Sequence, residues 1–494
     1  MKIAIVGMGV AGGNTLRSLY EKNAVRPSDE IHVYEDRLTP GVGLPYQPDD
    51  DRLILNSFSM DVSLNPDDPD EYVKFLEEHY PGRFGRYEFT PRMIFGEYAT
   101  QRFAPYLEKE EVQWIKKRVT RLTPILSDHH PDKLRFCVQV DQNRPGEIYD
   151  AVFLAVGHPP YADYYGLKGQ PGYIHEPFPV SHLLEQIDPS KDRVGIVGSS
   201  LTALDVMEYL QESASFAYPL TFYTLHEPFA TVKDTLYEGD EVFCTFDDAW
   251  IEAHRLPSGK IALDDVLAQF KKDLSDSQIH LDYIMEHFGT GSLYEVHQQL
   301  QQADEQLLKF QYYIALLSPH MTAIVNALDD RGRRHFFETY RPWYEYFHVQ
   351  LSKVKMEKIW KGYLNGTIRF VREIVVIEPA KDKGVVIKTA HHRTYHADVL
   401  INATGFETRL SYAAAEDPLI HSLLEADLMM PSPQQDVAIT WPGSQPLSRT
   451  YGVVDNLYLS GFWIGTTQYP NNNVQRAAQQ GARMVDSFKK NNHR

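Results

Sequence analysis

Short, mainly apolar runs that end in glycine-rich turns mark the start of this chain. Residues 2–6 form such a run, of the kind that a buried parallel strand uses. A turn rich in glycine, residues 7–13, follows directly, and residues 14–20 then have helical spacing. A second apolar run, residues 31–34, ends on Glu35. This order predicts the strand, turn, helix and strand of a parallel α/β fold.

The same pattern recurs further along the chain. An apolar run over residues 193–197 enters a turn at Gly198, and a helix over residues 201–211 and a strand over residues 220–225 are predicted after it. Two glycine turns, each between a strand and a helix, predict two Rossmann-like dinucleotide-binding domains. Further buried strands are predicted over residues 151–156, 398–402 and 457–460.

The period changes to that of helices in the middle of the chain. Helical spacing over residues 266–270, 283–288, 296–308 and 312–327 predicts an all-helical insertion over residues 233–365. Elsewhere we predict helices over residues 71–78 and 475–488, a small antiparallel sheet from residues 114–119 and 135–140, and a hairpin from residues 368–376 and 384–388.

Composition narrows the choice of partners. A chain of 494 residues is too long for a single hydrophobic core, so more than one domain is expected. Its net charge of −18 disfavours nucleic acids and anionic membranes as binding partners. No apolar run is long enough to span a bilayer, and Met1 directly precedes the first strand, so we expect a cytoplasmic protein without a signal peptide. Cys137 and Cys244 are far apart and not in a CxxC spacing, so neither a metal site nor a dithiol centre is predicted.

The first glycine turn has the residues that a dinucleotide needs. Gly7 allows the tight turn, Gly9 lets the backbone approach a pyrophosphate, and Gly12 lets the helix pack closely on the strand. The helix N-terminus then faces the phosphates. Glu35 stands where a carboxylate accepts hydrogen bonds from ribose hydroxyls. The neighbouring residues that we expect at this cofactor site are Val10, Ala11 and Asp36.

The second glycine turn departs from the usual pattern. It reads GxSxxA, with Ser200 in place of the middle glycine and Ala203 in place of the third. Alanine still permits close packing, and the serine hydroxyl can donate to a phosphate. The next strand, where the ribose of a nucleotide bound at this turn would lie, ends on His226 and Glu227 and carries no arginine for a 2′-phosphate. The residues predicted to bind this nucleotide are Gly198, Ser199, Ser200 and Ala203.

Several short stretches, taken with the first glycine motif, resemble the FAD/NAD(P)-binding oxidoreductases. They look most like the bacterial branch related to class B and N-hydroxylating flavin monooxygenases. The stretches are residues 41–46, 55–56, 66–69, 90–92 and 155–157. The resemblance implies that the first dinucleotide is FAD and that NAD(P)H binds at the second turn. Because that site has no arginine of its own for a 2′-phosphate, NADH and NADPH both stay open, with NADH expected to be accepted at least as well. The resemblance also implies places at the cofactor sites for Gly43, Tyr46, Asn56, Arg92, Val119, Ala155, Gly157, Thr404, Gly405, Gly461, Phe462 and Val474.

The resemblance further implies a discontinuous FAD domain with the NAD(P) domain inserted. We therefore expect FAD-binding parts at residues 1–190 and 366–494, an NAD(P)-binding segment at residues 191–232, and the helical insertion as a cap over a small-molecule substrate. Phe462 stands where many relatives have an aspartate that contacts the ribityl chain, so this contact is missing or supplied elsewhere. In the insertion, Arg341 and His348 are candidates for substrate contact, although such aromatic-rich helices more often pack in a core.

Three functions stay open. In a monooxygenase, NAD(P)H reduces the flavin, which then activates O2 and delivers one oxygen atom to a small substrate such as an amine. In a reductase or dehydrogenase, the electrons pass to a small acceptor or a protein partner. In a redox sensor, flavin is bound with weak turnover, which the altered second turn would allow. We take the monooxygenase as the main prediction, because the flavin supplies the chemistry and no hydrolytic triad stands out. The oligomeric state stays open.

Overall fold

The chain divides into two compact units. The computed structural model describes residues 1–126, 133–141, 145–233, 237–471 and 473–493. One unit is Met1–Pro160 with Phe406–Arg494, and the other is residues 161–405. A discontinuous unit with another inserted is thus observed, and the compact units divide after residues 160 and 405. The limits expected for the FAD- and NAD(P)-binding parts, at residues 190 and 366, stay a prediction. Residues 161–190 and 366–405 belong to the second unit because they supply three strands to its sheet.

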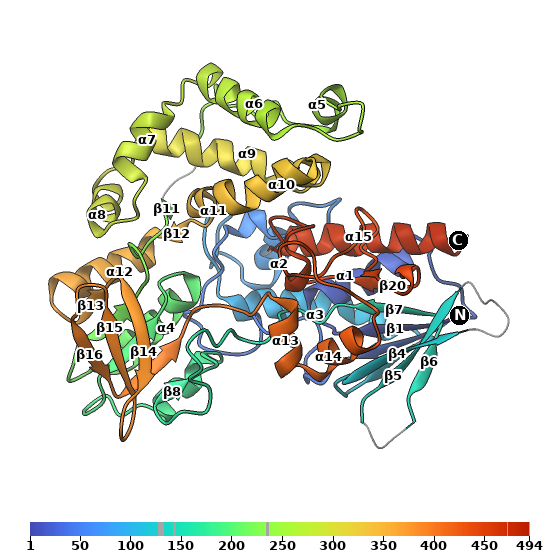
Figure 1. Cartoon of the computed structure of the whole chain (residues 1–494), viewed down its shortest axis with the longest axis horizontal. Coiled ribbons are helices and arrows are strands. Elements are labelled where there is room, and N and C mark those ends of the chain that lie inside the picture. Colours follow the sequence, from blue (N-terminus) through green and yellow to red (C-terminus); the bar gives the residue numbers. More distant parts are fainter. Residues whose placement is uncertain (127–132, 142–144, 234–236, 472, 494) are drawn as a thin grey trace. The chain divides into compact units, whose positions relative to one another are not determined.

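A parallel five-stranded sheet forms the centre of the first unit, in the order β20-β7-β1-β2-β3. Figure 1 labels three of these strands, β20, β7 and β1. Side chains such as Ile3, Ile5 and Phe153 are fully buried in a core on this sheet. Since all five strands are parallel, their carboxyl ends meet at one edge. The strands are β1 (Lys2–Val6), β2 (Glu30–Tyr34), β3 (Val112–Ile115), β7 (Ala151–Leu154) and β20 (Leu457–Leu459).

Helices α1 (Val10–Glu21) and α15 (Val474–Asn491) lie side by side against this sheet (Figure 1). Gly481 permits their approach, because a Cβ atom there would lie 3.0 Å from the backbone carbonyl carbon of Asn14. The remaining helices are α2 (Glu71–His79), α3 (Arg92–Leu107), α13 (Leu410–Glu416) and α14 (Pro418–Glu425). The predicted helices over residues 71–78 and 475–488 are therefore confirmed.

The small antiparallel sheet is present, but one of its predicted strands is wrong. Residues 114–119 do not join it, because β3 pairs in parallel with β2, with Trp114 opposite Val33. The chain then bends, as Lys117 N donates to Ile115 O over 2.8 Å, and a new strand begins at Arg121. The sheet consists of β4 (Arg121–Leu126), β5 (Leu134–Gln139) and β6 (Glu147–Tyr149), and a short hairpin is formed by β18 (Leu447–Ser448) and β19 (Gly452–Val453).

The second unit repeats the parallel design, with the strand order β13-β10-β9-β17-β8. Helix α4 (Leu201–Ser213) follows the Gly198 turn, as the sequence predicts. The strands are β8 (Tyr173–Ile174), β9 (Val194–Val197), β10 (Leu220–Tyr223), β13 (Ile368–Val371) and β17 (Val399–Asn402).

The predicted hairpin strand over residues 368–376 is wrong because the run divides into two strands. Strand β13 pairs in parallel with β10, and the chain then turns at Glu373, whose φ is +57°. Only β14 (Ile374–Pro379) forms the hairpin with β15 (Val385–Thr389), to which β16 (Thr394–Ala397) adds.

The insertion is mainly helical, as predicted, but not entirely. Strand β11 (Val232–Lys233) pairs in parallel with β12 (Leu351–Ser352). The predicted helix over residues 296–308 is two helices, because the Asp304 carboxylate accepts from Leu307 N and starts a new one. The helices are α5 (Asp248–Ala253), α6 (Leu263–Asp276), α7 (Leu281–Phe288), α8 (Leu293–Gln301), α9 (Glu305–Ala327), α10 (Asp330–His335), α11 (Arg341–His348) and α12 (Lys353–Leu364).

A buried ion pair joins α12 to α4. The Lys355 ammonium pairs with Asp205 Oδ1, and the two side chains are only 2% and 1% exposed. Glu208 lies 3.3 Å from the same ammonium and 2.8 Å from the Lys358 ammonium. Removing one partner of a buried pair leaves an uncompensated charge, which costs about 3–5 kcal/mol. This pair therefore ties the helical insertion to the second nucleotide fold.

We predict that Lys355→Met lowers the stability of the second unit by several kcal/mol, because Asp205 is left buried without its counter-charge. Urea denaturation followed by circular dichroism measures the loss. The double variant Asp205→Leu/Lys355→Met should recover much of it. Lys272→Met, which removes an exposed pair with Asp276, is the matched control. Equal denaturation midpoints for Lys355→Met and the control would contradict the role of the pair.

Candidate functional site

Four loops meet at the carboxyl edge of the first sheet. The glycine turn follows β1, Glu35 follows β2, Ala155 to His158 follow β7, and Gly461 follows β20 closely. In open parallel sheets, ligands bind in the crevice outside this edge. The structure therefore brings most of the predicted residues of the first cofactor site to one place, although they come from both ends of the chain.

The glycines of the first turn have different tasks. Gly7 has a φ of +94°, and a Cβ atom on it would lie 2.2 Å from Ala155 O. A Cβ atom on Gly12 would lie 1.9 Å from Gly7 O. Gly9 instead has an ordinary φ of −77° and its Cβ position faces Gly43, 3.3 Å from the Cα atom. Gly7 and Gly12 are thus required by the fold, whereas Gly9 keeps side-chain atoms out of the predicted pyrophosphate site, which fits FAD.

Glu35 connects two of the loops. Its side chain is buried, and Oε2 accepts from Met8 N over 2.9 Å while Oε1 accepts from Arg37 N over 3.0 Å. The carboxylate therefore fixes the turn after β1 against the segment after β2. Oε1 also lies 3.6 Å from Arg37 Nη1. A carboxylate oxygen can accept more than one hydrogen bond, and the predicted ribose contact stays a prediction.

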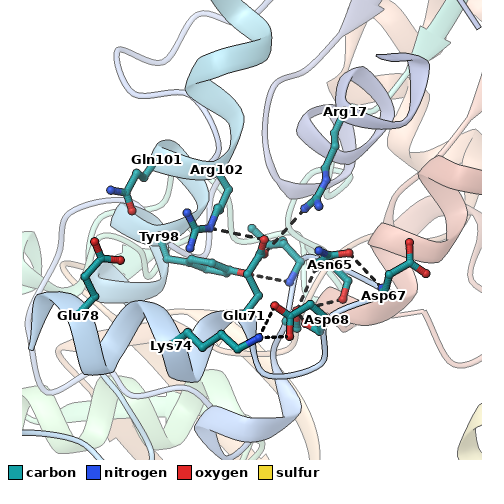
Figure 2. A network of polar contacts seen from close by, with 12 residues as sticks. Arg17, Asn65, Asp67, Asp68, Glu71, Lys74, Glu78, Tyr98, Gln101 and Arg102 are labelled. Carbon is teal, nitrogen blue, oxygen red and sulfur yellow. Dashed lines mark hydrogen bonds and ion pairs between the residues drawn. The ribbon is translucent and has the colours of Figure 1, made fainter. Parts of the chain in front are cut away.

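A polar network holds helix α1, which follows the first turn. Figure 2 shows Arg17 and Arg102 converging on Glu71, which also accepts from the Tyr98 hydroxyl. The arginine nitrogens lie 3.8 and 3.6 Å from the Glu71 carboxylate. Burial and this carboxylate raise the pKa of Tyr98, so its hydroxyl stays protonated and donates. Helices α1, α2 and α3 are thereby linked behind the turn.

An aromatic cluster surrounds the ends of β7 and β20. The His158 ring lies 4.3 Å from Phe406 and 5.3 Å from Phe462, measured between ring centroids. Phe462 N donates to Gly157 O over 3.0 Å, and Gly461 has a φ of +113°. Phe462 therefore packs in this cluster, which explains how a phenylalanine is accommodated where the resemblance expects aspartate.

The other residues assigned to the first site have varied surroundings. Arg92 Nε donates to Ile54 O over 3.0 Å, which supports a packing role for this arginine. The Tyr46 ring lies 4.5 Å from Phe95, and burial raises the pKa of its hydroxyl to about 12. Val119 belongs to the hydrophobic core, and Asn56 is half-buried. Contact of these residues with a cofactor stays a prediction.

The second site is built on the same principle. Gly198 has a φ of +111°, and a Cβ atom on it would lie 2.5 Å from Ala403 O at the end of β17. Ser200 is exposed at the start of α4 and makes no side-chain capping hydrogen bond, while Ala203 is fully buried. Gly405 has a φ of +91° and open space around its Cβ position.

Sequence reasoning missed Arg372. This arginine directly follows β13, and its Nη1 atom forms an ion pair with Glu227 Oε1. The segment after β10 contains no arginine of its own, but the parallel pairing of β10 with β13 brings one to it. Had the strand predicted over residues 368–376 been ended at Val371, Arg372 would have stood directly after a strand, in a segment like the one after β10 that holds Glu227.

Arg341 and His348 are engaged by nearby helices. Arg341 Nε lies 2.8 Å from Glu345 Oε1 on the same helix. His348 Nε2 lies 3.1 Å from Ser318 Oγ, and its ring stacks on Tyr344. These contacts fit the core-packing alternative, and substrate contact by either residue stays a prediction. No cluster of three or more metal-ligating side chains occurs within the described ranges.

Residues 4–159 match the model of a family described as FAD-NAD(P)-binding. This segment is an FAD/NAD(P)-binding domain. The match contains the first glycine turn, Glu35 and the loop after β7, so it agrees with the geometry of the first site. A comparison with curated proteins found no match. No helix among the residues described is both long and apolar enough to cross a membrane.

Solved structures share the fold over almost the whole chain. Ornithine hydroxylase (PvdA) from Pseudomonas aeruginosa has a TM-score of 0.60 at 15% identity, over 99% of both chains. The ornithine N-hydroxylase of Kutzneria sp. 744 has a TM-score of 0.56 at 14% identity, over 99% of this chain and 98% of that one. The cadaverine monooxygenase DfoA from Erwinia amylovora has a TM-score of 0.60 at 11% identity, over 99% and 94%. The predicted α/β fold beyond the FAD/NAD(P)-binding domain is thereby confirmed.

We predict that Gly9→Asp abolishes FAD binding, because it adds a negative charge at the predicted pyrophosphate site. The protein should still fold, because φ at Gly9 suits any residue and the added Cβ atom, 3.3 Å from Gly43 Cα, needs only a small shift of that neighbour. Gly85→Asp, in an exposed loop of the same unit, is the control. The flavin absorbance of the purified proteins, with circular dichroism as the test of folding, decides the outcome. Full flavin occupancy in Gly9→Asp would show that the first turn is not the FAD site.

His158 makes the stability of the first unit depend on pH. Burial, with a smaller contribution from Arg37, lowers the pKa of His158 to about 4. In the unfolded chain this histidine takes up a proton near pH 6.5, whereas in the folded protein it does so only near pH 4. The free energy of unfolding therefore decreases as the pH falls through this range, by about 2 kcal/mol at pH 5. His158→Phe should remove this loss and keep the ring contacts. Thermal unfolding at pH 7.5 and pH 5 tests it, with the exposed His391→Phe as control. An equal loss of stability between pH 7.5 and pH 5 in His158→Phe and in the unmodified protein would contradict this role of His158.

Proposed function

We propose that this protein is an FAD- and NAD(P)H-dependent monooxygenase that hydroxylates the amino group of a small substrate. The main support is an FAD/NAD(P)-binding domain within a fold that is shared, over almost the whole chain, with two hydroxylases of ornithine and a monooxygenase of cadaverine. Those neighbours are an ornithine hydroxylase, an ornithine N-hydroxylase and a cadaverine monooxygenase. All three act on small molecules with a primary amine at the end of a short carbon chain.

Two separate glycine turns support the use of two dinucleotides. The turn at Gly7 to Gly12 would hold the FAD pyrophosphate, and the turn at Gly198 to Ala203 the NAD(P)H pyrophosphate. Each turn packs on the backbone of an alanine, Ala155 or Ala403, which keeps the turn in place without a side chain near the phosphates. When bound, the flavin supplies hydride acceptance and oxygen activation.

The residues of the chain would bind and orient the two cofactors and keep water away from the flavin. The helix N-termini of α1 and α4 point positive potential at the two phosphate sites. The cluster of His158, Phe406 and Phe462 supplies apolar surface at the end of β7. Its histidine is neutral at physiological pH, because burial lowers its pKa to about 4, so no positive charge is added there. A disulfide reductase with a dithiol centre is disfavoured because Cys137 and Cys244 do not stand in a CxxC spacing.

We predict that short primary amines stimulate NAD(P)H oxidation and are converted to hydroxylamines. Ornithine, lysine, cadaverine and putrescine are tested with the FAD-loaded protein, and 1,5-pentanediol is the control that has the length of cadaverine but no nitrogen. The measurements are NAD(P)H consumption, hydroxylamine formation and hydrogen peroxide release. A hydroxylated amine formed in step with NAD(P)H consumption is the expected result.

Two outcomes would contradict the proposal. Rapid NAD(P)H consumption that no amine changes, with all oxygen recovered as hydrogen peroxide, would indicate a reductase or oxidase. Negligible consumption with every amine, despite bound FAD, would indicate a flavin-binding sensor.

A further inference from the structure

The ends of β9, β10 and β13 lie next to one another in the second unit. Tyr223 on the central strand is paired with Val197 on one side and with Val371 on the other. Backbone hydrogen bonds continue past the strands, since Thr224 N donates to Val371 O over 3.0 Å and Ile374 N donates to Thr224 O over 3.1 Å. The second glycine turn and the segments after β10 and β13 therefore occupy one edge of one sheet.

Arg372 and Glu227 face each other at this edge. Their ion pair joins the segment after β13 to the segment after β10. The side chains are 53% and 30% exposed, so a ligand can reach both. Neighbouring strands lie about 4.8 Å apart, so the backbone of Arg372 lies about one strand spacing from the end of β10 and about two, roughly 10 Å, from the end of β9 at the glycine turn. In a Rossmann fold the ribose of the adenosine lies at the end of the second strand, here β10.

We propose that Glu227 and Arg372 set the coenzyme preference of the second site. Arg372 is the guanidinium that can bind a 2′-phosphate, and Glu227 competes with that phosphate for it. The inference rests on the proposed function in taking this turn as the NAD(P)H site. NADPH has to displace Glu227 and leaves two negative groups close together, whereas NADH needs no displacement and offers ribose hydroxyls to the carboxylate.

Direct binding to the FAD-loaded protein tests this without turnover. Isothermal titration calorimetry gives dissociation constants for NAD+, NADP+, 5′-AMP and 2′,5′-ADP. The unmodified protein should bind NAD+ at least as tightly as NADP+. Glu227→Gln should tighten NADP+ and 2′,5′-ADP roughly tenfold, because a charge-assisted bidentate contact is worth about that much. It should not tighten 5′-AMP, whose ribose hydroxyls lose a charged acceptor.

The double variant and a control show that Arg372 is the group responsible. Glu227→Gln/Arg372→Gln should lose the whole gain for NADP+ and 2′,5′-ADP. Glu378→Gln, which breaks an exposed ion pair with Lys388 in the neighbouring β14–β15 hairpin, should change no dissociation constant. Circular dichroism verifies that the variants are folded.

Each outcome decides between the inference and the proposed function. A ratio of NADP+ to NAD+ affinity that does not change in Glu227→Gln overturns the inference, while nucleotide binding itself still supports the proposed function. A shifted ratio in a protein that hydroxylates no amine supports the inference and overturns the monooxygenase proposal. Failure of every variant to bind either nucleotide overturns both.

Discussion

The close contact between a glycine turn and the end of the adjacent strand is the constraint on which both nucleotide folds depend. In the first unit a Cβ atom on Gly7 would meet Ala155 O at 2.2 Å, and in the second a Cβ atom on Gly198 would meet Ala403 O at 2.5 Å. Each alanine is followed two residues later by a glycine of positive φ, Gly157 or Gly405, with no atom within 4 Å of its Cβ position. Both glycine turns therefore pack against the backbone of the adjacent strand end, and open space remains at the following glycine.

The two sites differ in how the segment after the second strand is held. In the first unit, Glu35 accepts from the backbone of Met8 and Arg37 and is buried. In the second unit, Glu227 is only partly buried and is held by the side chain of Arg372. A backbone tie fixes one geometry, whereas a side-chain pair in contact with solvent can exchange partners. This difference fits a permanently bound cofactor at the first site and an exchanging one at the second.

Much of this organisation could be predicted from the sequence because it depends on local sequence patterns. The runs before Gly7 and Gly198, the helices after them and the acidic Glu35 lie within short segments whose periodicity and spacing decide their structure. The resemblance to flavin monooxygenases also implied a discontinuous domain with another inserted, whereas the division of the compact units after residues 160 and 405 follows from the strand pairing in the structure.

The parts that could not be predicted depend on pairing between distant segments. Trp114 lies in the main sheet because β3 pairs with β2. Arg372 contacts Glu227 because β13 pairs with β10, although the helical insertion separates the two strands in sequence. The burial of Lys355 against Asp205 also has no local signal, since a lysine in an amphipathic helix is usually exposed. For Phe462 the sequence predicts only that a ribityl contact is missing or supplied elsewhere, whereas its packing against His158 is visible only in the structure.

The central claim is that the two glycine turns hold two dinucleotides, one of which reduces the other. Anaerobic mixing of the FAD-loaded protein with NADH and with NADPH tests it most directly. The account predicts that at least one nucleotide bleaches the flavin absorbance completely within the time of a turnover. A flavin that stays oxidised in the presence of either nucleotide at saturating concentration would contradict it.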